Sequence, residues 1–369
     1  MSYGGGGGSA GSAGYGSKSS GDPIAPIEYP PLQPTPVGAF RFNTDTSKLE
    51  YYDGNQWVNI TSTSPEVQTG GTRAVAGGGQ NPGVWSGTYK ATNTIQYVTI
   101  DTTGNAIDFG DLTWEAQLPY GCSDRTRGLF AAGYDHPTLV NTINYVTISS
   151  TGNGTDFGDL PYIRQNGAGT GNSTRGIFAG GSYSGSHNTI AYVTIQSTGD
   201  AQDFGDLAYV RSSVRAVQSP TRGVFCGGGD PHYDYIDYIT TATLGNAADF
   251  GNLTTAKKYV QAGSNAIRGI IANGYTGPAT YHNTIEYITI ATLGNALDFG
   301  DTTNIYAFGG ATASPTRYLR MGGKETGGGY TDTMDYVQIM TTGNAVDFGN
   351  LTNAMDSLAA TSNGHGGLG

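Results

Sequence analysis

The sequence predicts an all-β protein, a six-bladed β-propeller with four-stranded blades. Three observations predict it. The tripeptide Asp-Phe-Gly occurs six times at intervals of about 46 to 49 residues, which is the size of one propeller blade. A strand-like run with a shared Tyr precedes each copy. The composition favours strands joined by tight turns over helices.

The composition also limits the classes of partner. The 369 residues include 60 Gly and 25 Tyr, but only 18 Lys and Arg, and the formal net charge is −11. A duplex nucleic-acid binder needs a basic face, so we expect no nucleic-acid partner. The sequence shows no signal peptide and no apolar run of the roughly 18 residues that span a bilayer, so we expect no membrane insertion. Cys122 and Cys226 are isolated, and Cys226 is expected to be a small buried residue in a strand.

The first two strands of each repeat differ in regularity. A stretch rich in Ala, Ser and Gly is predicted to be the innermost strand, which would line a central channel. The second strand begins with Arg and ends in a Gly cluster, as in TRGIFAGG. We expect each Arg to pair between blades with backbone carbonyls or with a repeat Asp, since a buried unpaired charge is costly; anion binding is the alternative. The repeated arginines are Arg73, Arg127, Arg175, Arg222, Arg268 and Arg317.

The last two strands carry the clearest pattern. The third strand contains the shared Tyr, as in NTINYVTI, and a Gly-Asn turn joins it to the fourth. The Phe of Asp-Phe-Gly is expected to pack between blades, and the Asp to cap turn amides. Six copies on strands, with no companion kinase motif, exclude the magnesium-binding role that this tripeptide has in protein kinases. The repeated phenylalanines are Phe109, Phe157, Phe204, Phe250, Phe299 and Phe348.

The two ends of the repeat array predict how it closes. The first repeat begins at Arg73 without a clear inner strand, whereas the last continues past Phe348 into NAMDSLAATSNGHGGLG. A C-terminal strand at about residues 355–363 is therefore expected to complete the first blade. The glycines after it are expected to begin another Gly-rich strand.

The residues before the repeats divide into two parts. Residues 1–37 are predicted to be a flexible Gly-rich arm followed by a Pro-rich extended spacer. Residues 38–60 are predicted to form a small three-stranded β-meander. Because it is too short for a core of its own, the meander should dock on the propeller, on its own copies or on another protein. Residues 61–369 are assigned to the propeller.

The loops that differ between repeats are the expected recognition surface. They follow the Gly strand, lie on the face opposite the Gly-Asn turns, and are rich in Tyr, His, Gly and Ser, which suit a binding surface. No metal, no cofactor and no catalytic residues are expected, because neither ligand spacing nor a nucleophile–base pattern is present. The candidate binding residues are Trp85, Tyr89, Tyr134, His136, Tyr183, His187, His232, Tyr233, Tyr275, Tyr281, His282 and Tyr330.

The repeat resembles that of kelch proteins, with a strand ending in a Gly doublet, a Tyr strand and an outer aromatic, although Phe stands where kelch repeats usually have Trp. The resemblance covers about residues 72–368. The meander and the Asp-Phe-Gly repeats also look like those of virion structural and fibre proteins of tailed phages, particularly marine phages.

This resemblance implies a virion protein, and the absence of a catalytic pattern predicts that it is not an enzyme. Residues 1–60 would attach it to other virion proteins, and the propeller would display a site for a host-surface glycan or protein, as in a tail fibre. The alternatives are a decoration, collar or assembly protein without a receptor, and a propeller enzyme acting on polysaccharide.

Overall fold

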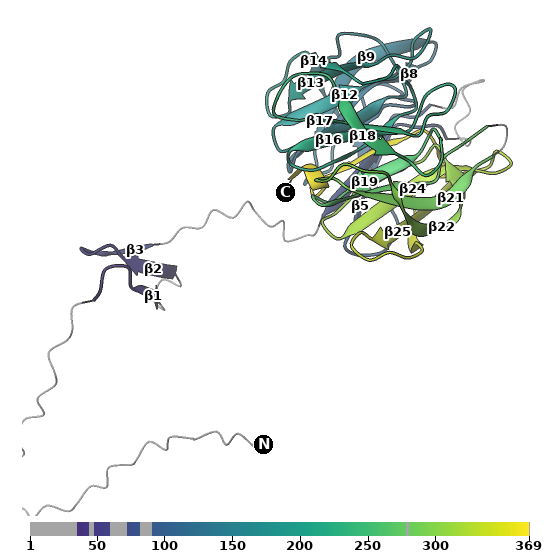
Figure 1. Cartoon of the computed structure of the whole chain (residues 1–369). Helices are drawn as coiled ribbons and strands as arrows, with labels where there is room; N and C mark the ends of the chain where they lie inside the picture. The colour runs from purple at the N-terminus through teal and green to yellow at the C-terminus, as the bar shows by residue number, and fades with distance from the viewer. Residues whose placement is uncertain (1–34, 44–47, 60–71, 82–90, 278–279, 369) are drawn as a thin grey trace, which may run out of the picture. The chain divides into compact units, whose positions relative to one another are not determined.

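A computed structural model describes residues 35–43, 48–59, 72–81, 91–277 and 280–368 (Figure 1). The chain divides into two compact units, Met1–Glu66 and Val67–Gly369. The all-β class is confirmed, because every element but one short 3₁₀ helix in the described ranges is a strand. No helix in these ranges is long and apolar enough to cross a bilayer.

The first unit contains a three-stranded antiparallel meander of β1 (Phe40–Asn43), β2 (Lys48–Tyr52) and β3 (Trp57–Asn59). Its two faces differ, because side chains alternate along each strand. One face carries the half-exposed Arg41, which forms an ion pair with Glu50 at 2.7 Å and stacks on Trp57. The other face is apolar and exposed, and is described with the candidate sites below.

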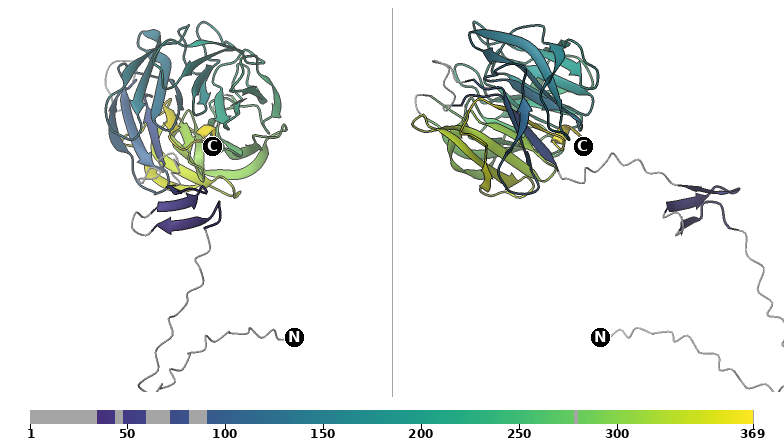
Figure 2. Two further views of the ribbon diagram at one scale, coloured as in Figure 1. Left: turned by 90° about the vertical axis from the view of Figure 1, so that its left-hand side faces the viewer. Right: turned by 180° about the vertical axis from the view of Figure 1, so that it is seen from behind.

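The second unit consists of four-stranded antiparallel sheets and one eight-stranded sheet (Figure 2). In strand order the four-stranded sheets are β27-β4-β5-β6, β10-β9-β8-β7, β11-β12-β13-β14 and β15-β16-β17-β18. The eight strands β19 to β26 form two arrays of four, linked where the end of β22 pairs with β24 through Tyr306–Glu325 and Ala307–Lys324. Each array follows one sequence repeat, so the architecture is compatible with a propeller-like fold.

The strands of the first three repeats share one order: an inner strand, an Arg strand, a Tyr strand and a Phe strand. In the first repeat these are β27 (Ala359–Ser362), β4 (Arg73–Gly77), β5 (Thr94–Thr99) and β6 (Ile107–Asp111). In the second they are β7 (Tyr120–Ser123), β8 (Arg127–Asp135), β9 (Thr138–Thr147) and β10 (Thr155–Asp159). In the third they are β11 (Ala168–Gly171), β12 (Arg175–Ala179), β13 (Thr189–Thr194) and β14 (Gln202–Asp206).

The last three repeats have the same order. The fourth comprises β15 (Arg215–Gln218), β16 (Arg222–Cys226), β17 (Tyr235–Thr240) and β18 (Ala248–Asn252). The fifth comprises β19 (Gln261–Ser264), β20 (Arg268–Ala272), β21 (His282–Thr289) and β22 (Leu297–Ala307). The sixth comprises β23 (Gly310–Ala313), β24 (Arg317–Glu325), β25 (Tyr330–Gln338) and β26 (Val346–Asn350).

The inner strands lie side by side. Contacts join β7 to β11, β11 to β15, β15 to β19, β19 to β23, β23 to β27, and β27 to β7. Small residues permit this approach: a Cβ on Gly169 would lie 2.2 Å from the carbonyl oxygen of Gly121. The inner strands therefore need Gly and Ala where they meet.

The C-terminal strand β27 pairs with β4 from Ala359–Gly77 to Ser362–Ala74. The prediction of a Gly-rich strand after β27 is wrong. Gly366–Leu368 instead form the 3₁₀ helix η1, which is buried and contacts β15. His365 fixes this end, because its Nε2 lies 2.8 Å from the carbonyl oxygen of Ser123 and its Nδ1 accepts a hydrogen bond from Gly367.

Every repeat contains the same stack of three side chains. In the first repeat the Arg73 guanidinium lies 4.3 Å from the Tyr97 ring centroid, and Tyr97 makes an edge-to-face contact with Phe109 at 5.9 Å. The Phe is buried in all six repeats. The stack therefore places one cation–π and one aromatic contact at the same point of each sheet.

The repeated arginines also bridge from one sheet to the next. Each Nη1 donates to a backbone carbonyl at the end of the following repeat's Tyr strand, at 2.9 to 3.0 Å. The carbonyl, rather than an Asp, is thus the partner. The acceptors, in order from Arg73 to Arg317, are Ile148, Ile195, Thr241, Ile290, Ile339 and Ile100.

The expectation that the Asp of Asp-Phe-Gly caps turn amides is wrong. Asp108 and its equivalents are exposed, because they alternate with the buried Phe along the strand. The residue after the turn Gly caps instead: Asn153 Oδ1 accepts from the amide of Asp111 in the preceding repeat at 3.1 Å. The other repeats have the same bond.

Candidate functional site

The strand directions place the described irregular loops of the second unit at one end. Because neighbouring strands are antiparallel, the loops after the Arg strands and after the Phe strands emerge together. We call this end the loop face. The Gly-Asn turns and the helix η1 lie at the opposite end, since β27 runs from the loop face towards η1.

A cycle of six backbone hydrogen bonds lies at the loop face, just before the inner strands. Each amide donates to the carbonyl of the equivalent residue in the preceding repeat, at 2.6 to 3.4 Å. All six residues have φ between 56° and 63°, which is unusual for side chains other than Gly. They are Leu118, Asn166, Ser213, Tyr259, Phe308 and Ser357.

Two members of this cycle are aromatic and belong to a larger cluster. Tyr259 and Phe308 stack with ring centroids 3.9 Å apart. Tyr281 lies 5.4 Å from Tyr275 and 6.5 Å from Phe308, and His232 lies 5.8 Å from Tyr275. None of the five rings is fully buried. We call His232, Tyr259, Tyr275, Tyr281 and Phe308 the aromatic site; it spans the fourth, fifth and sixth repeats.

Charged groups border the aromatic site. Lys258 Nζ lies 5.7 Å from the Tyr259 ring centroid and 4.0 Å from Asp230 Oδ1. Partial burial, reinforced by Lys258, lowers the pKa of His232, so this imidazole is neutral at pH 7. The site thus combines apolar ring faces with a neutral imidazole and the Lys258–Asp230 ion pair.

A buried carboxyl lies beside the aromatic site. Burial raises the pKa of Asp356 to about 6. Burial also raises the pKa of Tyr281 and of Tyr330, with a smaller contribution from Asp356. Asp356 Oδ1 has no hydrogen-bond partner among the described residues. Lys324 Nζ lies 5.6 Å from the Tyr330 ring centroid, and the Tyr330 hydroxyl lies 3.3 Å from Gln80 Oε1. A buried carboxyl with a raised pKa therefore lies at the loop face.

The structure brings together only some of the predicted binding residues. Three of them, His232, Tyr275 and Tyr281, lie in the aromatic site, whereas Tyr330 contacts Lys324 and Gln80. Tyr233 belongs instead to a neighbouring stack in which Tyr235 lies 5.0 Å from Tyr233 and 4.2 Å from Tyr209.

The remaining predicted residues are dispersed. Tyr134 and His136 contact each other in the second repeat, at 5.8 Å. In the third repeat Tyr183 is 51% exposed, and His187 Nε2 bonds its carbonyl. His282 Nε2 bonds the Thr276 hydroxyl at 2.9 Å. Trp85 and Tyr89 lie outside the described residues.

Sequence reasoning missed Tyr259, Phe308, Lys258 and Asp356. A signal for the first two was present, because they precede inner strands at a position where the other repeats have Leu118, Asn166, Ser213 and Ser357. Two aromatic residues at a position that is otherwise small or aliphatic mark the repeats that carry the site.

Sequence reasoning also missed three buried ion pairs. Lys257 Nζ lies 2.5 Å from Glu286 Oε1, and the other two pairs join Arg211 to Asp237 and Arg320 to Asp335. All six side chains are at most 2% exposed. The acids occupy one repeat position, two residues into the buried part of the Tyr strand, where the first three repeats have Gln96, Asn144 and Ala191.

A second candidate surface is the apolar face of the meander. Phe40 pairs with Tyr51 and Phe42 with Leu49 across β1 and β2. Their exposed fractions are 68%, 37%, 61% and 46% respectively. We call these four residues the meander face. Isolated exposed apolar side chains are ordinary, but a contiguous exposed apolar face marks a candidate interaction surface.

Other reactive groups do not form a site. Cys226 is fully buried in β16, as predicted, and burial raises the pKa of its thiol to about 12. Within the described ranges no three His, Cys, Asp or Glu side chains are grouped to hold a metal.

No protein-family model and no curated protein sequence matches this chain.

Proposed function

We propose that the second unit is one closed, six-bladed β-propeller. Three repeating features support the proposal: the contacts among the inner strands, the bridging arginines and the six-membered cycle of backbone hydrogen bonds. In each of them the sixth repeat is linked to the first. The pairing of β27 with β4 supplies the fourth strand of the first blade.

Removal of β27 tests the closure. A chain ending at Leu358 leaves β4 without its partner and should lose cooperative unfolding, whereas a chain lacking residues 1–34 should keep the wild-type transition. Circular dichroism during urea unfolding distinguishes the two. A sharp, unshifted transition in the chain ending at Leu358 would contradict a closed ring.

We propose further that the protein is a non-enzymatic recognition component of a virion, attached through its N-terminal part and binding a host-surface glycan at the loop face. The observation that carries the proposal is the aromatic site, where Tyr275, Tyr281 and Phe308 form one partly exposed cluster. Aromatic ring faces provide rigid apolar area, and the adjacent Lys258 and Asp230 can bond sugar hydroxyls. The virion setting rests on the resemblance of the repeats and the meander to phage structural proteins.

A glycan array with the full-length protein tests the recognition. The wild-type protein should bind a discrete set of glycans, and Tyr275→Ala should lose them. Tyr183→Ala is the matched control, because Tyr183 is an exposed Tyr of the same face outside the aromatic site. Absence of glycan binding by the wild-type protein would instead favour a decoration, collar or assembly role.

The meander face is the proposed attachment surface, and its occupant is another virion protein. The double variant Phe40→Ser, Phe42→Ser should be incorporated poorly into particles, because the apolar face no longer gains from burial. Tyr275→Ala should be incorporated normally. Quantitative mass spectrometry of purified particles measures both; full incorporation of the double variant would refute this attachment.

A further inference from the structure

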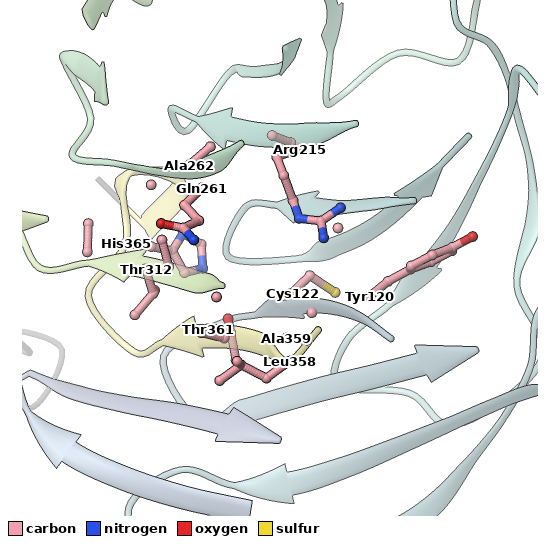
Figure 3. A pocket seen from close by; sticks show the side chains of 18 of the residues that line it. Tyr120, Cys122, Arg215, Gln261, Ala262, Thr312, Leu358, Ala359, Thr361 and His365 are labelled. Carbon is pink, nitrogen blue, oxygen red and sulfur yellow. The ribbon is translucent and has the colours of Figure 1, made fainter. Parts of the chain in front are cut away.

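The inner strands of the second unit enclose a polar cavity of about 60 Å³ (Figure 3). Its wall consists mainly of Gly and Ala, with a few polar side chains at its edges. The cycle of hydrogen bonds precedes the inner strands at the loop face, and His365 lies at the opposite end. About 10–15 Å³ of such space suffices for one water molecule, so the cavity has room for a small ion together with several waters.

Arg215 is the one charged side chain among the described residues that line this cavity. Its Nη1 donates to the carbonyl of Val214 at 2.9 Å and to that of Gly167 at 3.3 Å. No carboxylate lies within ion-pair distance of Arg215 among the described residues, and none lines the cavity. The partly buried guanidinium thus brings a positive charge between the inner strands without a carboxylate to compensate it.

Gln261 extends into the same region from the next inner strand (Figure 3). It occupies the position equivalent to Arg215, since each is the first residue of its strand. Its side chain is fully buried, yet neither Nε2 nor Oε1 has a hydrogen-bond partner among the described residues. A buried amide in this state is expected to bond a molecule within the cavity.

His365 does not supply charge to the cavity. Its Nδ1 accepts from the Gly367 amide, so its Nε2 carries the hydrogen and donates to Ser123. Burial lowers the pKa of this imidazole to about 4. The cavity therefore has one positive charge, supplied by Arg215.

We propose that the cavity between the inner strands binds one small monovalent anion of the size of chloride, held by the Arg215 guanidinium and the Gln261 side-chain amide. The ion compensates the partly buried charge of Arg215 and accepts a hydrogen bond from Gln261 Nε2, which has no protein partner among the described residues. It stabilises the junction of the inner strands.

The test compares the full-length protein in sodium chloride and in sodium gluconate at equal ionic strength. Chloride should raise the melting temperature by a few degrees in a saturable manner, because it binds only the folded state. Arg215→Gln should abolish this difference. Arg175→Gln is the control: Arg175 bonds the Thr241 carbonyl outside the cavity, so this variant should melt earlier yet keep the chloride effect.

A second measurement uses only the wild-type protein, so it does not depend on whether Arg215→Gln folds. Crystals of the wild-type protein soaked in sodium bromide should show an anomalous peak beside Arg215 and Gln261. An equal chloride effect in wild type and Arg215→Gln, or the absence of halide at this position, would overturn the proposal. Glycan binding is measured separately, with the Tyr275→Ala variant.

Discussion

The second unit contains two kinds of cationic side chain, the repeated arginines and a few fully buried ones outside the repeat motif, and they stabilise it in different ways. Each repeated Arg is half-buried, stacks on a Tyr and bonds a backbone carbonyl of the next repeat. In contrast, Arg211, Lys257 and Arg320 are buried and pair with carboxylates in the fourth, fifth and sixth repeats. The aromatic site is built from these same three repeats. Shared residues therefore provide the architecture, whereas the buried ion pairs and the aromatic site both depart from the repeat and lie in the fourth, fifth and sixth repeats.

The largest effect is expected when one partner of a buried ion pair is removed. Asp237→Ala leaves Arg211 without its carboxylate and should lower the free energy of unfolding by about 3–5 kcal/mol. The double variant Arg211→Met, Asp237→Leu should lose much less, because no charge remains buried. Urea unfolding measures both. Equal losses in the two variants would show that packing, rather than the unpaired charge, determines the effect.

The second-largest effect on stability is expected from protonation of His365, which lies near the C-terminus. Its folded-state pKa of about 4 lies below the ordinary value of 6.5. The unfolded chain therefore binds the proton first as the pH falls. This contribution to stability is present above pH 6.5 and is lost as the pH falls towards 4, on the order of 3 kcal/mol in all.

Urea unfolding at a series of pH values measures this loss. His365→Gln should flatten the decline between pH 6.5 and 4, although it also lowers stability at pH 7. An unchanged pH profile in His365→Gln would exclude His365 as the titrating group.

A smaller effect is expected for the repeated arginines. Arg222→Met removes the bond to the Ile290 carbonyl and the contact with Tyr238, and should cost about 1–2 kcal/mol. Arg127→Met, the matched substitution in another repeat, should cost the same within about 0.5 kcal/mol, since its contacts are equivalent. Widely different losses would contradict the structural equivalence of the repeats.

The smallest effect is expected for the Asp of Asp-Phe-Gly. Asp108→Asn changes an exposed side chain and should alter the free energy of unfolding by less than about 0.5 kcal/mol. Asn153→Ala, which removes a cap from the Asp111 amide, should cost more. The reverse order would restore the capping role first expected for the Asp.

The sequence predicted the strands well, because repetition reveals them independently of weak local propensities. Every Arg, Tyr and Phe strand lies where its motif predicted it, and the C-terminal strand pairs with β4 as the ends of the array implied. The prediction for the end of the chain was wrong. GHGGLG resembles the start of a Gly strand, but β4, the Arg strand of the first repeat, already pairs with β27 and β5. The capping role predicted for Asp108 was wrong, because a periodic carboxylate suggests capping whether its side chain faces the turn amides or the solvent.

The candidate site was predictable only in part. Loop composition identified the face and residues such as Tyr275 and Tyr281, but adjacency in space among loops of different repeats is not encoded in their spacing. Tyr183 and Tyr275 look alike in sequence, yet only Tyr275 meets other aromatic side chains. The ion pairs were missed because acid and base lie 26, 29 and 15 residues apart, without a motif that links them.

The most direct test of the account is the dissociation constant of the full-length protein for a glycan that the array identifies. We predict that Tyr275→Ala weakens binding at least about tenfold, equivalent to about 1.4 kcal/mol, while its urea unfolding stays close to wild type and Tyr183→Ala binds normally. Wild-type affinity in Tyr275→Ala would contradict recognition at the aromatic site.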